Sequence, residues 1–174
     1  SMSKFSRSKG QRGERTVAKL LQERLGCEVT RELSASRDGG CDIKVQLEDI
    51  TYLIEVKFHT KVSQSIVGGW WDQALEQSKL QEEVYLNPIP ILIYKQTHWK
   101  QWECRIPWNH MLSKMKMTNI KVKSDDDMTK CHVTLPIDML CSIMKANRLN
   151  TISKGKIMTT DNNDVDRASL GVQR

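Results

Sequence analysis

Two charged residues, Glu55 and Lys57, interrupt the apolar stretch TYLIEVKFHT at residues 51–60. The stretch is rich in aromatic and branched residues, which is typical of a β-strand. Side chains alternate between the two faces of a strand, so the two charged residues share one face and the apolar residues between them share the other. A buried charge is costly unless it is paired or binds a metal. The pair therefore marks a candidate chemical site, although the same pattern is also typical of the solvent-exposed face of an edge strand.

Two further carboxylates, Asp42 and Glu14, are placed where they could join Glu55. Asp42 follows a Gly-Gly turn and opens the stretch CDIKVQL, which is expected to form a hairpin with the strand that carries Glu55. Glu14 lies on the apolar face of a helix expected over residues 10–25. Carboxylates at short range repel one another unless a cation lies between them, and their oxygens are the ligands that Mg²⁺ prefers. The set favours a divalent metal site, with Lys57 placed to orient a water or to stabilise developing negative charge.

The elements that would hold these residues can be read from the hydrophobic periodicity. The expected order is a helix at 10–25, strands at 27–33, 41–47 and 51–60, a helix within 63–86, and strands at 90–96 and 99–107. The second helix carries a partial apolar stripe of Trp71, Leu75, Ser78 and Leu80. The strand at 90–96 is almost continuously apolar, which indicates a central position in the sheet. This order predicts an α/β domain with a mixed sheet flanked by helices.

The pattern after residue 107 is weaker. Two strands at 120–124 and 131–135 are expected there, followed by a helix at 136–149 whose apolar face comprises Ile137, Leu140, Cys141 and Met144. The chain is therefore divided into a core at 1–107 and a C-terminal extension at 108–174, which is expected to pack on the core or on a dimer partner.

The composition narrows the class of protein. The 174 residues carry a net charge of +6, which favours an acidic partner such as nucleic acid or an anionic membrane. No apolar run approaches membrane-spanning length, so we expect a soluble, cytoplasmic protein without a membrane partner. The five cysteines are widely spaced with no CxxC pair, which argues against a zinc site or a disulfide framework. No Gly-x-x-x-x-Gly-Lys phosphate loop occurs in the sequence, so no nucleotide cofactor is expected.

The order of these motifs resembles the PD-(D/E)xK nuclease superfamily, in which a helical Glu, an Asp and a strand E-x-K follow one another. The segment KGQRGERTVAKLLQERLG, residues 9–26, is similar to the first helix of archaeal-type Holliday junction resolvases, and CDIKV and LIEVKFHT also fit that family. The resemblance covers residues 9–107 and implies a restriction-endonuclease-like fold. One departure is Cys41, which stands where the name of the superfamily implies Pro.

The resemblance implies a homodimeric endonuclease that depends on Mg²⁺, with Mn²⁺ as a substitute. The catalytic set would be Glu14, Asp42, Glu55 and Lys57. The metal would be held by Asp42 and Glu55, with the Val56 carbonyl as a possible third ligand and Glu14 direct or through water. The residues implied or expected to contact DNA are Lys9, Arg12, Arg15, Arg31, Ser34, Ser36, Arg37 and Gln73. Gln73 fits an ordinary exposed helix position equally well.

Branched DNA, such as a four-way junction, is the expected substrate in a prokaryotic or phage-infected cell. A nuclease with another target in restriction, repair or replication stays open, as does a non-catalytic DNA-binding module of the same fold. Trp70, Trp71 and the helix at 136–149 are candidates for the dimer interface, and the two tryptophans could instead stack on unpaired bases. The cluster of Lys114, Lys116, Lys121 and Lys123 could follow a DNA backbone or form a solvated face.

Overall fold

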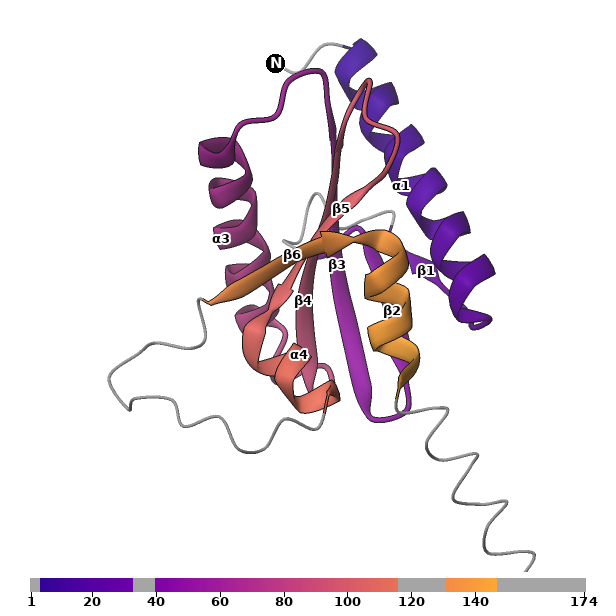
Figure 1. Ribbon diagram of the computed structural model, residues 1–174, viewed down its shortest axis with the longest axis vertical. Coiled ribbons are helices and arrows are strands. Elements are labelled where there is room, and N and C mark those ends of the chain that lie inside the picture. Colours follow the sequence, from indigo (N-terminus) through magenta and orange to yellow (C-terminus); the bar gives the residue numbers. More distant parts are fainter. Residues whose placement is uncertain (1–3, 33–39, 116–130, 147–174) are drawn as a thin grey trace, which may run out of the picture.

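A computed structural model describes residues 4–32, 40–115 and 131–146 of the chain (Figure 1). The predicted α/β architecture is confirmed: six strands form one mixed sheet with helices on both faces. The elements are α1 (Lys4–Leu25), β1 (Thr30–Arg31), β2 (Ile43–Leu47), β3 (Ile50–His59), α3 (Gln64–Leu80), β4 (Pro88–Gln96), β5 (Glu103–Pro107), α4 (Trp108–Lys114), β6 (His132–Pro136) and a helix over residues 137–146.

The strands lie in the sheet in the order β1-β2-β3-β4-β5-β6, which is their order in the chain. Every neighbouring pair is antiparallel except β3 and β4, which are parallel. A parallel pair needs a crossover connection, and α3 supplies it. The predicted hairpin between β2 and β3 is confirmed, and its tight turn places Glu48 at a φ of 54°.

Helix α1 packs through apolar residues at helical spacing. Val17, Leu21 and Leu25 are buried, and the helix ends at Gly26, whose φ of 61° suits glycine. The helix begins at Lys4 rather than at the predicted Gly10, because none of the residues before Gly10 breaks a helix. Gly13 lies inside the helix where a Cβ atom would be only 2.9 Å from the Phe58 Cβ atom, so this glycine lets α1 approach β3 closely.

The two faces of the sheet have different partners (Figure 1). On one face α1 and the helix over 137–146 cover a large apolar cluster that includes Ile54, Ile91 and Ile106. On the other face α3 covers a smaller cluster, whose buried members are Val67, Trp71, Ala74, Leu92 and Tyr94. The predicted stripe of α3 is partly wrong: Leu80 is 69% exposed, because the helix buries positions at the spacing of Val67, Trp71, Ala74 and Ser78.

Two predicted strand boundaries change. Of the strand expected at 27–33, the described residues 27–32 place only Thr30 and Arg31 in the ladder, opposite Lys44 and Ile43 of β2. The strand expected at 99–107 begins at Glu103, after a turn.

The C-terminal part of the described chain joins the same sheet and core. β6 pairs with β5, and the helix over 137–146 buries Ile137, Leu140, Cys141 and Met144, the face predicted from the sequence. The strand expected at 120–124 lies outside the described residues, as do Lys116, Lys121 and Lys123. Lys114 is buried, which removes it from an exposed basic face. None of the helices in the described ranges is long and apolar enough to cross a membrane.

Candidate active site

The site begins where β3 extends past the end of β2. The last pair of the hairpin ladder joins Ile43 to Ile54, so the β3 residues from Glu55 onward have no partner in β2. Asp42 fills this step: its N–H donates to the Ile54 carbonyl at 3.0 Å, and its Oδ2 accepts from the Val56 N–H at 2.8 Å. The Asp42 carboxylate is therefore held by the backbone against the strand that carries Glu55 and Lys57.

Glu55 is a buried carboxylate on an interior strand. Its residue is only 4% exposed, and β3 lies between β2 and β4, so the solvent-face interpretation of the E-x-K pattern is wrong. Glu55 Oε1 lies 2.7 Å from the Lys57 Nζ, whereas its Oε2 is buried without a hydrogen-bond partner among the described residues. A buried carboxylate oxygen without a partner is costly, so this atom is available for a ligand.

The two carboxylates act on each other electrostatically. Burial, and after it the neighbouring Glu55 and Glu14 carboxylates, raise the pKa of Asp42 to about 7 against the opposing effects of the Val56 N–H and Lys57. A cation between the carboxylates would relieve both the repulsion and the unpartnered oxygen. The donor set of Asp42 and Glu55 therefore fits a hard divalent cation such as Mg²⁺.

Glu14 reaches this region from α1 and is paired with a cation. Arg31 Nη2 lies 3.0 Å from Glu14 Oε2, and both side chains are about three-quarters buried. Arg31, predicted to contact phosphate, thus contacts Glu14, a predicted metal ligand. As the side chains stand, the described residues contain no group of three or more His, Cys, Asp or Glu arranged to hold a metal ion.

The predicted DNA-contacting residues differ in their surroundings. Arg12 and Arg15 are exposed on α1, and Gln73 is exposed on α3. Lys9 is half-buried: its ammonium donates to the hydroxyls of Thr60 at 3.1 Å and Thr97 at 2.6 Å. Ser34, Ser36 and Arg37 lie outside the described residues.

Sequence reasoning missed Arg105, a second buried charge on the α3 face of the sheet. Arg105 pairs with Leu92 across the ladder, is 7% exposed, and donates to the Gln64 Oε1 at 3.0 Å. The signal was present in the strand ECRIP, where a charged residue stands between two apolar ones in the same manner as Glu55. The face of the sheet under α3 therefore carries a buried charge on β5 as well as on β3.

Comparison with known proteins places the site in context. The model of a family described as phage putative PDDEXK endonuclease matches residues 5–159, a range that contains Glu14, Asp42, Glu55 and Lys57. Among solved structures, the chain is similar to Hjc of Archaeoglobus fulgidus, a Holliday junction resolvase from an archaeal hyperthermophile, at 18% identity and a TM-score of 0.39, over 57% of this chain and 76% of that chain. No curated protein matches the sequence.

Proposed function

This chain belongs to the phage putative PDDEXK endonuclease family, and from that premise we propose that it is a divalent-metal-dependent endonuclease that cuts branched DNA inside the host cell. The observation that carries the proposal is the buried Glu55, which has one oxygen on Lys57 and the other without a partner. Asp42 is fixed beside it by two hydrogen bonds to the β3 backbone, one from its N–H and one to its Oδ2.

The roles follow from these contacts. Asp42 and Glu55 would hold Mg²⁺, for which Mn²⁺ substitutes, and the bound metal would supply Lewis acidity at the phosphate. Asp42 must lose its proton to act as a ligand, so its pKa of about 7 makes ligation weaker in acid. Lys57 lies beside Glu55 and would stabilise the negative charge that develops on the phosphate. Glu14 would act from the outer side of the site, with Arg31 holding its carboxylate.

Phosphate contacts would come from the exposed cations of α1. Arg12 and Arg15 are exposed, so they could contact a DNA backbone. Each phosphate contact adds about 0.9 to the slope of log affinity against log salt. Replacing both arginines by Ser should therefore flatten that slope by about two units, whereas an unchanged slope would place the DNA on another surface.

The preference for branched DNA is tied to a homodimer. A four-way junction needs two cuts, and the chain has one candidate catalytic set, so two copies would supply both sites. Part of the predicted dimer interface is buried inside the monomer. Trp71 is 3% exposed, and the apolar face of the helix over 137–146 lies in the core. Trp70 stays half-buried.

The deciding experiment compares a labelled four-way junction, a blunt duplex and a single strand, each incubated with the protein and Mg²⁺. We expect paired nicks in the junction and slower cleavage of the other two. Mixed dimers of wild-type and Asp42→Asn chains should nick a cruciform plasmid, which wild-type dimers should linearise. Preferred cleavage of linear DNA would indicate a nuclease with another target, and binding without any cleavage would indicate a non-catalytic module.

A further inference from the structure

Four aromatic rings form a continuous row at the end of the sheet where β3 and β4 finish. We call His59, Trp70, Tyr94 and Trp99 the aromatic row. The ring centroids of His59 and Trp70 are 4.7 Å apart, those of Trp70 and Tyr94 are 6.3 Å apart, and those of Tyr94 and Trp99 are 6.0 Å apart. The rings come from β3, α3, β4 and the turn after β4, so the fold assembles the row from four places in the chain.

The row is anchored at its centre and open at its ends. Tyr94 is only 3% exposed and belongs to the small cluster under α3. Trp70 and Trp99 pack against that cluster and are half-buried, whereas His59 is exposed. Trp71, the neighbour of Trp70 in the chain, is 3% exposed and is a buried member of that cluster. The partly exposed rings are therefore held in fixed positions without being enclosed.

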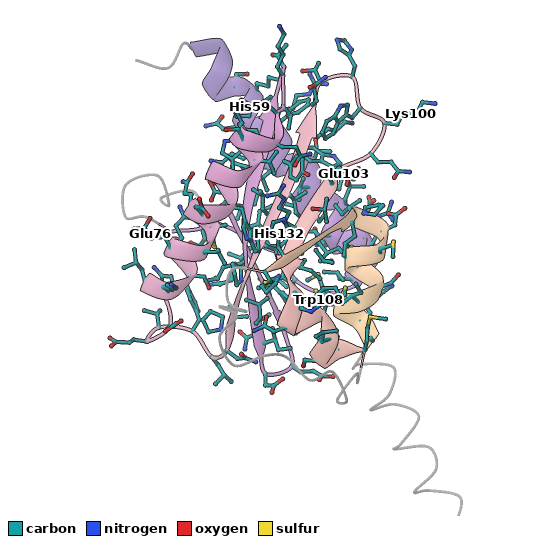
Figure 2. The ribbon with its side chains drawn as sticks, turned by 60° about the vertical axis from the view of Figure 1, so that its left-hand side comes forward. His59, Glu76, Lys100, Glu103, Trp108 and His132 are labelled. Carbon is teal, nitrogen blue, oxygen red and sulfur yellow. The ribbon has the colours of Figure 1, made fainter. Side chains whose placement is uncertain are left out.

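Several cations surround the row beside the candidate active site, together with the carboxylate of Glu103, which stands opposite Tyr94 in the β4–β5 ladder. Lys57 precedes His59 by two residues on the same face of β3. The pKa of His59 is lowered by burial first and then by the positive charges of Lys57 and Lys9. Figure 2 shows His59 and Lys100 at the same end of the molecule, with Lys100 on the turn between β4 and β5. Lys61 and Lys100 are both exposed.

We propose that the aromatic row is a stacking site for an unpaired base of the DNA substrate, next to the point of cleavage. The inference rests on the proposed function and names the feature of branched DNA that the site would recognise. Aromatic rings stack on any base through its π-face, and nearby cations attract the phosphates on either side of it. Trp70 and Trp99 are only half-buried, unlike Trp71, so a base could reach their rings.

The test measures binding without cleavage, in EDTA, with fluorescently labelled (dT)10 and a blunt ten-base-pair duplex as probes. Trp70→Leu removes the ring but keeps an apolar side chain, and Trp70→Phe keeps a ring. Stacking contributes about 1–3 kcal/mol per base, so Trp70→Leu should weaken (dT)10 binding about 5- to 150-fold. Trp70→Phe should restore most of that loss, and the affinity for duplex should change less than about twofold.

Met139→Ala is the matched control, because Met139 is 56% exposed outside the row. It should leave both affinities unchanged. Unaltered (dT)10 binding by Trp70→Leu, or an equal loss for (dT)10 and duplex, would overturn the inference. The thermal midpoint of each variant identifies a folding defect, in which case Trp99→Leu at the other end of the row repeats the test. Cleavage of plasmid by wild-type protein with Mg²⁺ is scored separately, so loss of the stacking result leaves the nuclease proposal standing.

Discussion

The two faces of the sheet differ in the kinds of side chain that they bury. The face under α1 and the helix over 137–146 is filled mainly by aliphatic side chains, together with Cys104, Cys141, Tyr52 and Trp102. On the face under α3, the strands carry Thr51, Glu55 and Arg105, the buried polar and charged residues that the described strands contain. Burial of apolar surface stabilises a fold without regard to direction, whereas buried charges need defined partners. We infer that the apolar cluster of the first face holds the fold together, whereas the strands carry their buried charges on the second face.

The sharpest way to test this division is to remove the carboxylates. Asp42→Asn and Glu55→Gln should each lower the cleavage rate with Mg²⁺ by about 100-fold or more, since even the outer partners of metal ligands contribute 10- to 100-fold. Binding of DNA in EDTA should persist, because phosphate contacts come from other residues. The check is a plasmid-nicking assay beside a binding assay. Near-normal turnover in either variant would exclude these two residues as the metal ligands.

The opposite face should respond in stability rather than in chemistry. Leu140 and Met144 are 1% and 2% exposed, so replacing either by Ala should lower the free energy of unfolding by about 2–5 kcal/mol. Urea unfolding measures this, and cleavage per folded molecule, assayed well below the midpoint, should be retained. Met139→Ala on the same helix should change stability by less than about 0.5 kcal/mol. A loss of turnover in folded Leu140→Ala would contradict the inference that this face contributes to stability and not to cleavage.

Two glycines of α1 offer a smaller, paired test of packing on that face. A Cβ atom at Gly13 would lie 2.9 Å from the Phe58 Cβ atom, whereas one at Gly10 would meet nothing within 4 Å. Gly13→Ala should therefore destabilise by about 1–3 kcal/mol through overpacking. Gly10→Ala should stabilise by up to about 1 kcal/mol, because alanine favours a helix. Equal effects in thermal or urea unfolding would show that α1 can shift away from β3.

The final test is the pH dependence of stability, which should have opposite signs at two sites. Burial raises the folded pKa of Asp42 from 3.8 to about 7, so the metal-free native state binds the extra proton and loses stability as pH rises through this range. Burial lowers the folded pKa of His110 from 6.5 to about 4, so the unfolded state binds the extra proton and stability falls as pH drops below 6.5.

Variants separate the two contributions. In EDTA, the free energy of unfolding of Asp42→Asn should increase relative to that of wild type as pH rises from 4 to 8, by at most about 1.4 kcal/mol per pH unit. His110→Gln should lose the hydrogen bond to the Tyr52 hydroxyl at 3.1 Å, yet its stability should fall less steeply between pH 6.5 and 4. Urea midpoints at four pH values measure both slopes. Parallel curves for wild type and Asp42→Asn would mean that Asp42 has an ordinary pKa.

Much of this arrangement could be predicted from the sequence, because strand alternation and helical spacing are local signals. Alternation placed Glu55 and Lys57 on one face, and helical spacing identified the buried face of the helix over 137–146. The contacts between distant residues could not be predicted. The pairing of Arg31 with Glu14 and the aromatic row depend on how α1, α3 and the sheet pack, and no local pattern records that.

The order of the strands has a consequence for how the chain acquires its structure. Because each strand pairs with the next one in the chain, the sheet can grow by adding one strand at a time to an existing edge. The short loop of the β2–β3 hairpin closes at little entropic cost. Pairing of β3 with β4 closes a longer segment that contains α3, and its entropic cost is larger. We therefore expect the hairpin to form early in folding and the β3–β4 pairing to form more slowly. We therefore expect Glu55 and Lys57 to acquire their neighbours on β4 late in folding, when the β3–β4 pairing forms.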